Sequence, residues 1–248
     1  MYRIHASYHK CLTQYYMKVM RKIFNWLPGR ERYRHFESIE GVFYNNLGRY
    51  KVLSTNNFRI ELERLGGDFR LSRFIRDPRD LIVSGYFYHR RGAEPWFRMQ
   101  NPTEKYWEPL NGHVPDQLTK EQSYTDYLQT LSKEEGLRAE IAFRKYHLES
   151  MRNWSNDERI KLFKYEEILG NEVEVFSEIM EHYGFSSNLV SLAKFWANKY
   201  RYKSPKAAHR HIRNPKPAQW REHFSPQLQK EFNEQYGDIL ETYGYPIN

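Results

Sequence analysis

The clearest pattern of hydrophobic and polar positions lies at the start of the chain. Residues 3–8 have the character of a short strand, and residues 9–13 form a tight polar turn that holds one lysine. From Thr13 onward, apolar side chains recur at helical spacing and form one stripe. Its members are Tyr15, Tyr16, Val19, Met20, Ile23, Phe24 and Leu27. Pro28-Gly29 then ends the helix, so the pattern predicts a strand, a lysine-bearing turn and a helix.

The same patterns predict strands that alternate with helices along the rest of the chain. Strands are expected at 50–55, 69–75 and 159–164. Helices are expected at 58–66, from Pro78, at 122–131, 136–153, 172–183 and 188–200, and from Pro226. Residues 28–50 are polar and irregular. Alternating strands and helices imply a mainly parallel sheet covered on both faces, and we expect one α/β domain over residues 1–248.

Residues 92–123 carry neither pattern and are rich in proline, glycine and aromatic residues. A segment of this length inside a compact domain is usually a lid or a binding loop. Trp96, Tyr106 and Trp107 argue against plain disorder. We predict that the segment is a lid or an acceptor-binding loop that becomes more ordered when its ligands bind.

Charge and composition narrow the classes of partner. The formal net charge is +8 and 17% of the residues are aromatic, which suits a polyanionic partner such as a nucleic acid, an anionic membrane face or a nucleotide with several phosphates. No RNA-recognition sequence, zinc-finger spacing or basic low-complexity arm accompanies this charge, so we expect no nucleic acid. Cys11 is the only cysteine, and no apolar run is long enough to span a bilayer. We therefore expect a cytoplasmic protein with no membrane span.

The turn at residues 9–13 has the features of a phosphate site. The first N–H groups of a helix have no partners inside the helix, and the helix dipole is positive there. Lys10 adds a full charge, and the Thr13 hydroxyl adds a donor. The turn is not a Walker A loop, because that motif needs glycines and none occurs before Gly29. A charged turn without a ligand is the plain alternative.

The segment His9-Lys10-Cys11-Leu12-Thr13-Gln14 resembles the 5′-phosphosulfate loop of PAPS-dependent sulfotransferases, commonly P-K-[SAT]-G-T-T. Lys10 and Thr13 match, whereas Leu12 replaces the usual glycine and Gln14 the second threonine. We expect Leu12 to adopt an ordinary negative φ, which the first turn of a helix allows.

Residues 76–84, RDPRDLIVS, closely resemble the 3′-phosphate motif of the same family, R-[ND]-P-x-D-x-x-x-S. Arg76 leaves the end of a strand, where its planar group can grip a phosphate with two hydrogen bonds. Ser84 lies two turns into the helix and adds a hydroxyl. The alternative is a well-capped strand–helix unit with a surface arginine, which the full spacing disfavours.

Two further segments match in the order of the family. Residues 165–168, YEEI, resemble the Y-E-D-L turn, whose tyrosine, here Tyr165, lies near the adenine. Residues 213–220, RNPKPAQW, resemble R-K-G-x-x-G-x-W, with the lysine and both glycines replaced and Ala218 at the second glycine. The resemblance carries over Arg213 as a 3′-phosphate ligand. A basic surface loop is the competing interpretation.

Together the four segments resemble a PAPS-dependent sulfotransferase over most of the chain. The resemblance implies a P-loop-like three-layer fold and transfer of a sulfuryl group from 3′-phosphoadenosine 5′-phosphosulfate (PAPS) to a hydroxyl or amine, without a metal. The product nucleotide is adenosine 3′,5′-bisphosphate, and the acceptor is a small molecule or a glycan. The resemblance places the donor on Lys10, Cys11, Leu12, Thr13 and Gln14. Tyr15, where the family often has tryptophan, either stacks on the adenine or belongs to the core.

The general base has several candidates. Many cytosolic members carry a histidine at the end of the second strand, and residues 51–57, KVLSTNN, have none. The heparan-sulfate branch uses a glutamate in a segment like T-F-E-E-I-Q-F-F, which residues 35–43 resemble. Glu37 or Glu40 is therefore the candidate, with His35 behind them. For each, a solvated loop charge is the plain alternative.

Two other function classes compete with the sulfotransferase hypothesis. A small-molecule or nucleotide kinase would need an atypical phosphate loop, and the chain lacks an evident magnesium-binding carboxylate. A noncatalytic binder of polyanions would show steep salt dependence and little preference for a nucleotide 3′-phosphate. The sequence indicates no particular oligomeric state.

Overall fold

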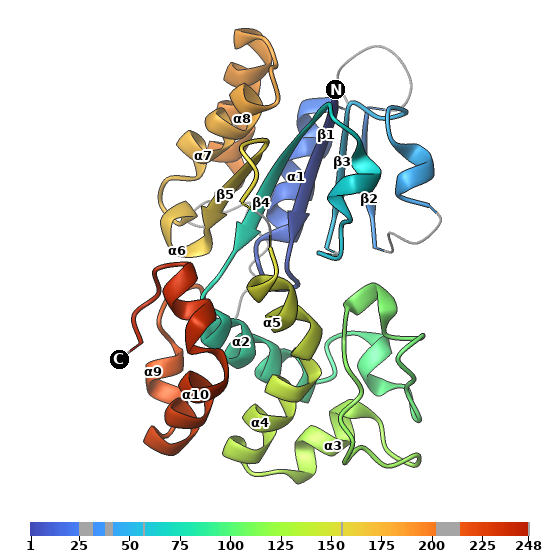
Figure 1. Ribbon diagram of the computed structural model, residues 1–248, viewed down its shortest axis with the longest axis vertical. Coiled ribbons are helices and arrows are strands. Elements are labelled where there is room, and N and C mark those ends of the chain that lie inside the picture. Colours follow the sequence, from blue (N-terminus) through green and yellow to red (C-terminus); the bar gives the residue numbers. More distant parts are fainter. Residues whose placement is uncertain (25–31, 38–41, 57, 155, 202–213, 248) are drawn as a thin grey trace. The chain divides into compact units, whose positions relative to one another are not determined.

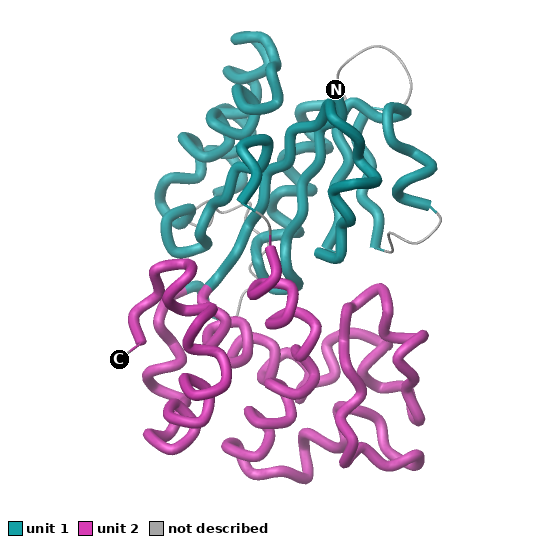
Figure 2. Tube along the Cα trace, viewed as in Figure 1, with its two compact units in different colours: residues 1–76, 155–215 teal, residues 77–154, 216–248 magenta. Residues whose placement is uncertain are grey.

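The computed structural model describes residues 1–248 apart from 25–31, 38–41, 57, 155, 202–213 and 248 (Figure 1). Two compact units make up the chain (Figure 2). The first contains residues 1–76 and 155–215, and the second contains residues 77–154 and 216–248. A single domain over residues 1–248 stays a prediction, and each unit is described by itself.

The first unit is built on a five-stranded sheet in the order β2-β3-β1-β4-β5, and every strand pairing in it is parallel. The strands are β1 (Tyr2–Ser7), β2 (Tyr33–Phe36), β3 (Val52–Thr55), β4 (Phe69–Ile75) and β5 (Ile160–Lys164). This confirms the predicted α/β class with a parallel sheet flanked by helices. Strand β2 was not predicted, because residues 28–50 looked irregular.

Long helices accompany the sheet in the described part of this unit (Figure 1). They are α1 (Thr13–Phe24), α7 (Glu172–His182) and α8 (Ser187–Tyr200), and the shorter elements are η1 (Tyr44–Asn46), η2 (Leu62–Leu65) and α6 (Tyr165–Ile168). The stripe of α1 is buried as predicted from Tyr16 to Phe24, and α1 packs against α8, which packs against α7. The predicted helix over 58–66 is reduced to the single 3₁₀ turn η2. Leu27 lies outside the described residues.

A buried polar cluster joins α1 to the sheet. The His5 ring stacks on Tyr16 with centroids 3.5 Å apart, and its Nδ1 lies 2.8 Å from the Ser72 hydroxyl. Ser72 in turn lies 2.6 Å from the hydroxyl of Tyr183, which donates to the carbonyl of Ile4. Burial lowers the pKa of His5 well below its usual value, so the ring is neutral. These contacts fix where α1 begins relative to the end of β1.

The second unit is helical in its described residues. Its elements are α2 (Pro78–Arg90), η3 (Pro95–Arg98), η4 (Glu108–Leu110), α3 (Tyr124–Thr130), α4 (Lys133–Phe143), α5 (Lys145–Arg152), α9 (Trp220–His223) and α10 (Pro226–Thr242). Asp77 and Ser225 cap α2 and α10 as predicted. Within the predicted lid at 92–123, Phe97 and Trp107 are fully buried and contribute to the core of this unit, whereas Tyr106 is exposed.

Asp80 explains the second aspartate of the RDPRD segment. Its carboxylate accepts hydrogen bonds from the backbone N–H of Ala218 at 2.8 Å and of Trp220 at 3.0 Å. Ala218 has a φ of +60°, the left-handed conformation in which glycine is usual. Arg79 forms a two-pronged bond with Asp77 and lies over the Trp220 ring. Within this unit, α2 therefore holds the turn that precedes α9.

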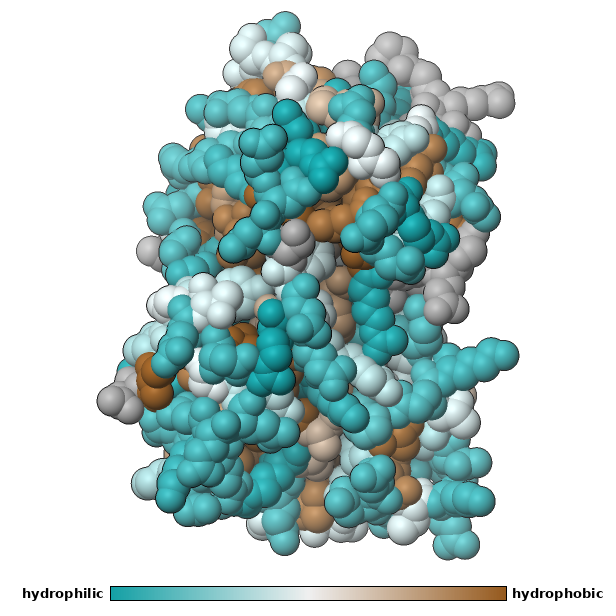
Figure 3. All heavy atoms as spheres, in the orientation of Figure 1, coloured by the Kyte–Doolittle hydropathy of each residue, from teal (hydrophilic) through white to brown (hydrophobic). Residues whose placement is uncertain are grey.

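On the face drawn in Figure 3, hydrophilic side chains cover most of both units and apolar ones occupy smaller areas. This agrees with the mean hydropathy of −0.89. Among the residues that the structure describes, no helix is both long and apolar enough to cross a membrane.

Replacement of Asp80 should destabilise the second unit. In Asp80→Asn the amide nitrogen faces an N–H group that has lost its acceptor, so we expect a loss of about 1.5–3 kcal/mol in the free energy of unfolding. Denaturant unfolding followed by tryptophan fluorescence measures it. Asp116→Asn, at an exposed aspartate of the same unit, is the control and should change stability by less than about 0.5 kcal/mol. Equal stabilities of the two variants would contradict this role for Asp80.

Candidate functional site

The turn between β1 and α1 uses the left-handed backbone conformation at two residues that are not glycine. Lys10 has a φ of +72° and Leu12 a φ of +59°. The expectation that Leu12 adopts a negative φ is therefore wrong. The chain reverses from strand to helix within five residues, and the position where the family pattern has glycine keeps the conformation that glycine serves. A side chain in this conformation costs about 1–2 kcal/mol, which the surrounding contacts must offset.

Hydrogen bonds hold the turn closed. The N–H of Cys11 donates to the carbonyl of Tyr8 at 3.0 Å, and the hydroxyls of Ser7 and Thr13 lie 2.7 Å apart. The first turn of α1 contains no acidic residue. The positive end of the helix dipole is therefore not neutralised from within the first turn, and the partly buried Lys10 adds its charge nearby.

Two buried arginines, one inside β4 and one directly after it, lie toward the same edge of the sheet as this turn. Strand β4 runs parallel to β1, with Arg73 opposite Ala6, and both Arg73 and Arg76 are buried. The guanidinium of Arg73 donates to the hydroxyl of Tyr8 at the base of the turn. Burial and, after it, the nearby Glu166 raise the pKa of the Cys11 thiol, while Arg76 and Arg73 act in the opposite direction. Both cations therefore act electrostatically on the turn.

Arg76 also joins two of the other predicted segments. Its guanidinium lies over the ring of Tyr165, 4.1 Å from the centroid, and the hydroxyl of Tyr165 donates to the carbonyl of Pro215 at 2.9 Å. Segments far apart in the sequence therefore meet beside one arginine within the first unit. Arg213 lies outside the described residues.

The remaining predicted donor ligands have different surroundings. Gln14 is exposed at the start of α1. The hydroxyl of Tyr15 donates to the carbonyl of Ala197, and its ring meets Phe176 edge-on at 5.3 Å, so this side chain packs between α1 and its neighbouring helices. Ser84 is partly buried in α2 of the second unit.

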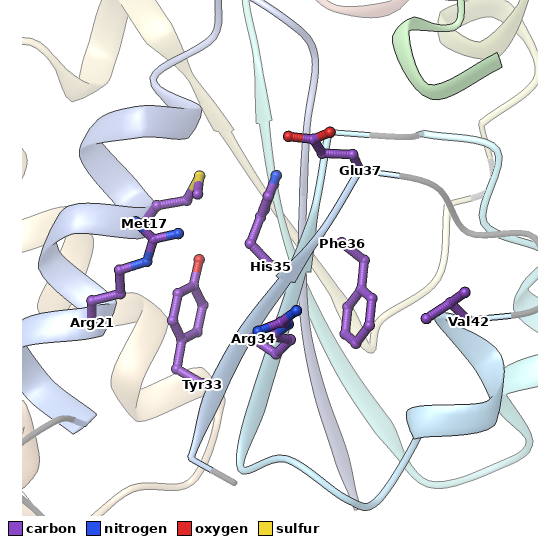
Figure 4. A pocket seen from close by; sticks show the side chains of 8 residues that line it. All are labelled: Met17, Arg21, Tyr33, Arg34, His35, Phe36, Glu37 and Val42. Atoms are coloured by element: carbon purple, nitrogen blue, oxygen red, sulfur yellow. The ribbon is translucent and has the colours of Figure 1, made fainter. Parts of the chain in front are cut away.

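The candidates for the general base lie on the unpredicted edge strand. Strand β2 pairs only with β3, and a pocket of about 520 Å³ beside it is lined by His35 and Glu37 (Figure 4). His35 Nδ1 lies 2.9 Å from the Ser54 hydroxyl, which lies 2.6 Å from the hydroxyl of Tyr33. Burial, followed by the nearby Arg21, lowers the pKa of His35 to about 4. Glu40 lies outside the described residues.

Strand register relates this pocket to the turn. Phe36 is opposite Thr55, and Thr55 is opposite Ala6. Glu37, the next residue, is therefore level with Ser7 at the carboxyl edge of the sheet, two strand spacings or about 10 Å away. Ligands of open parallel sheets bind outside this edge. The turn, Arg76, Tyr165 and Glu37 all follow strands that end there.

Sequence reasoning did not predict a role for Arg73, Tyr33 or Ser54, which contact the candidate site residues or one another. Arg73 lies inside a strand pattern, where a charged residue gives no local signal of function. Tyr33 and Ser54 meet His35 only through the pairing of β2 with β3. The place of Arg73 in a predicted central strand, directly before Phe74 and Ile75, was the one available hint, because an arginine is rarely buried without a partner.

Comparisons with known proteins identify the family and the fold. A family model described as a sulfotransferase domain matches residues 72–244, well over half of the chain. Residues 1–71, with the turn and β2, precede the matched range, so their assignment rests on geometry. No curated protein sequence matches the chain.

Solved structures share the fold at low sequence identity. A mouse sulfotransferase, SULT7A1, complexed with PAP is 15% identical, with a TM-score of 0.52 over 96% of this chain and 83% of that one. A retinol dehydratase in a complex with retinol and PAP is 16% identical, with a TM-score of 0.52 over 96% of this chain and 80% of that one. The same enzyme in complex with androsterone and PAP gives a TM-score of 0.50.

The predicted family is therefore confirmed over residues 72–244, and the kinase and polyanion-binder alternatives are not favoured. The chain belongs to the sulfotransferase domain family and is a sulfotransferase.

Proposed function

We propose that this sulfotransferase moves the sulfuryl group of PAPS to a hydroxyl or amine of a small-molecule or glycan acceptor, and that the turn at residues 8–13 holds the donor. The observation that carries the proposal is the convergence of buried positive charge on this turn: Arg73 contacts Tyr8, and both Arg76 and Arg73 act electrostatically on Cys11 at its centre. The sulfotransferase structures that share the fold contain PAP, which supports PAPS as the donor.

In the reaction, the acceptor oxygen or nitrogen forms a bond to sulfur while the bond from sulfur to the 5′-phosphate oxygen breaks. The electron pair of that bond stays on the phosphate, and the acceptor proton passes to a base. The protein's work is to align the two substrates and to stabilise charge on the leaving phosphate. Lys10, Thr13 and the first N–H groups of α1 do this at the turn.

The other binding roles follow from the resemblance to the family motifs. Arg76 binds the 3′-phosphate, with Ser84 and Arg213 as further ligands. Tyr165 contacts the adenine side of the nucleotide. Cys11 and Leu12 contribute mainly backbone, because the Cys11 side chain is buried and Leu12 has the positive φ that shapes the turn.

The base belongs to the pocket beside β2. His35 is the stronger candidate, because its ring lines the pocket and is neutral near pH 7. The same lowered pKa makes it a weaker base than a free imidazole. Ser54 fixes its orientation. Glu37 is the alternative at the sheet edge. A cytoplasmic location is part of the same proposal, and a single buried thiol without a disulfide supports a reducing compartment.

Nucleotide preference tests the 3′-phosphate assignment. We expect adenosine 3′,5′-bisphosphate to bind at least about ten-fold more tightly than 5′-AMP, because a charge-assisted contact contributes about 1.5–3 kcal/mol. Arg76→Ala should remove most of this preference, and Lys51→Ala, at an exposed lysine of the same unit, should keep it. Calorimetric titration with and without magnesium measures both. Equal affinities in the unmodified protein, or an absolute need for magnesium, would contradict the assignment.

Lys10 should matter more for rate than for binding. Charge on the leaving phosphate is largest in the transition state, so Lys10→Ala should lower turnover by about 10²-fold or more. Affinity for adenosine 3′,5′-bisphosphate should fall only modestly, because Thr13 and the backbone remain. Lys10→Arg should rescue in part, since a planar guanidinium does not replace a compact ammonium. A folded Lys10→Ala protein with unchanged turnover would show that the lysine is not catalytic.

Paired substitutions should identify the base. If His35 is the base, His35→Gln lowers kcat by about 10²–10⁴-fold with unchanged nucleotide affinity, and Glu37→Gln has a small effect. The activity of the unmodified enzyme should then stay level as pH falls through 6.5 and decline only toward pH 4, because His35 gains its proton there. His113→Gln, outside the pocket, is the control. The reverse ranking of the two variants would assign the base to Glu37.

A further inference from the structure

The pocket beside β2 holds two arginines to which sequence reasoning gave no role. Arg21 comes from α1 and Arg34 from β2, and both line the same cavity (Figure 4). Neither forms an ion pair with any residue of the described chain, whereas Arg138, Arg152 and Arg159 each bond an acidic side chain. The cavity therefore holds two arginines against one carboxylate, Glu37, and neither arginine is ion-paired with it.

The rest of the lining suits a ligand with an apolar body. Met17, Phe36 and Val42 supply apolar surface to the cavity, and 52% of Val42 is exposed. A volume of about 520 Å³ lies within the range of small-molecule sites, which are largely apolar with a few placed polar groups. It admits a molecule of the size of a substituted phenol or one sugar ring.

The position of the cavity links it to the reaction. It contains His35 and Glu37, and Glu37 is level with Ser7 at the edge of the sheet where the turn at residues 8–13 begins. A hydroxyl placed between these groups would face a base on one side and the donor turn on the other. The arginines would then contact a different part of the same molecule.

We propose that this cavity receives the acceptor, and that Arg21 and Arg34 select acceptors bearing an anionic group, a carboxylate or a sulfate, on the same molecule as the hydroxyl. The proposal rests on the sulfotransferase function proposed above. Guanidinium groups bind such oxyanions through paired hydrogen bonds. The proposal adds a substrate class: hydroxy acids with a small ring, such as phenolic or uronic acids.

Binding of an anionic acceptor at Arg21 would also change the pKa of His35. Arg21 is close enough to His35 to lower the pKa of its ring, after the larger effect of burial. An acceptor anion paired with Arg21 offsets that charge, so the bound acceptor makes His35 a better proton acceptor. Tyr33 and Ser54 also face the ring and are uncharged near pH 7; burial raises the pKa of Tyr33.

Matched pairs of ligands test the selectivity. The first pair is 4-hydroxyphenylacetate and its methyl ester, and the second is methyl β-D-glucuronide and methyl β-D-glucoside. Binding to the full chain saturated with adenosine 3′,5′-bisphosphate is followed by NMR of the arginine side-chain N–H signals, and sulfation is followed with labelled PAPS. In at least one pair, we expect the acid to bind about ten-fold or more tightly than its neutral partner, shifting the signals of Arg21 and Arg34.

Variants assign the effect to the cavity. Arg21→Gln combined with Arg34→Gln should abolish the preference for the acid while leaving affinity for adenosine 3′,5′-bisphosphate unchanged. Arg64→Gln, at an exposed arginine of the same unit outside the cavity, should keep the preference. Where a pair is sulfated, the double variant should raise KM for the acid more than it changes kcat.

Several results would overturn the proposal. They are equal binding of acid and neutral partner in both pairs, a preference that survives in the double variant, or one that is lost equally in Arg64→Gln. Failure of adenosine 3′,5′-bisphosphate to bind is a separate result, because it would overturn the sulfotransferase function itself. Equal binding in a protein that does bind this nucleotide overturns only the anion selectivity.

Discussion

The turn from β1 into α1 is the constraint on which the site depends. Lys10 and Leu12, neither of which is glycine, adopt a left-handed backbone conformation there, at a cost of about 1–2 kcal/mol each. Both ends of the turn are fixed by buried contacts: the stacking of His5 on Tyr16 ties α1 to the sheet, and Ser7 contacts Thr13 across the turn. The surrounding fold thus maintains a conformation that the local sequence disfavours.

Buried positive charge is the second part of the same design. Arg73 and Arg76 are removed from water at the edge of the sheet, where an isolated charge is expensive. Their contacts with Tyr8 and Tyr165 are to aromatic residues that carry no opposite charge near neutral pH. A ligand that binds the folded site and not the unfolded chain stabilises the fold, so the stability of the first unit and its affinity for a bound anion are linked.

Much of the fold follows from local patterns. The bounds of strands β4 and β5 lie within one residue of those predicted. Helix α10 begins directly after Ser225, the residue predicted to cap it. Strand β2 was missed because it has only four residues, three of them charged or titratable, at the sheet edge. The φ of Leu12 was wrong because a local preference was allowed to outweigh the geometry of the turn. The arginines of the pocket lay beyond sequence reasoning, since Arg21 is on the exposed face of a helix and meets β2 only in three dimensions.

The burial of Cys11 has a practical consequence. It is the only cysteine in the chain, it is fully buried at the centre of the turn, and burial keeps its thiol protonated at neutral pH. A thiol reagent can therefore modify the protein only when this turn opens to solvent. The rate at which a thiol reagent labels Cys11 therefore measures how often the turn opens. A ligand that occupies the turn would slow this labelling, so binding can be followed without an enzymatic assay.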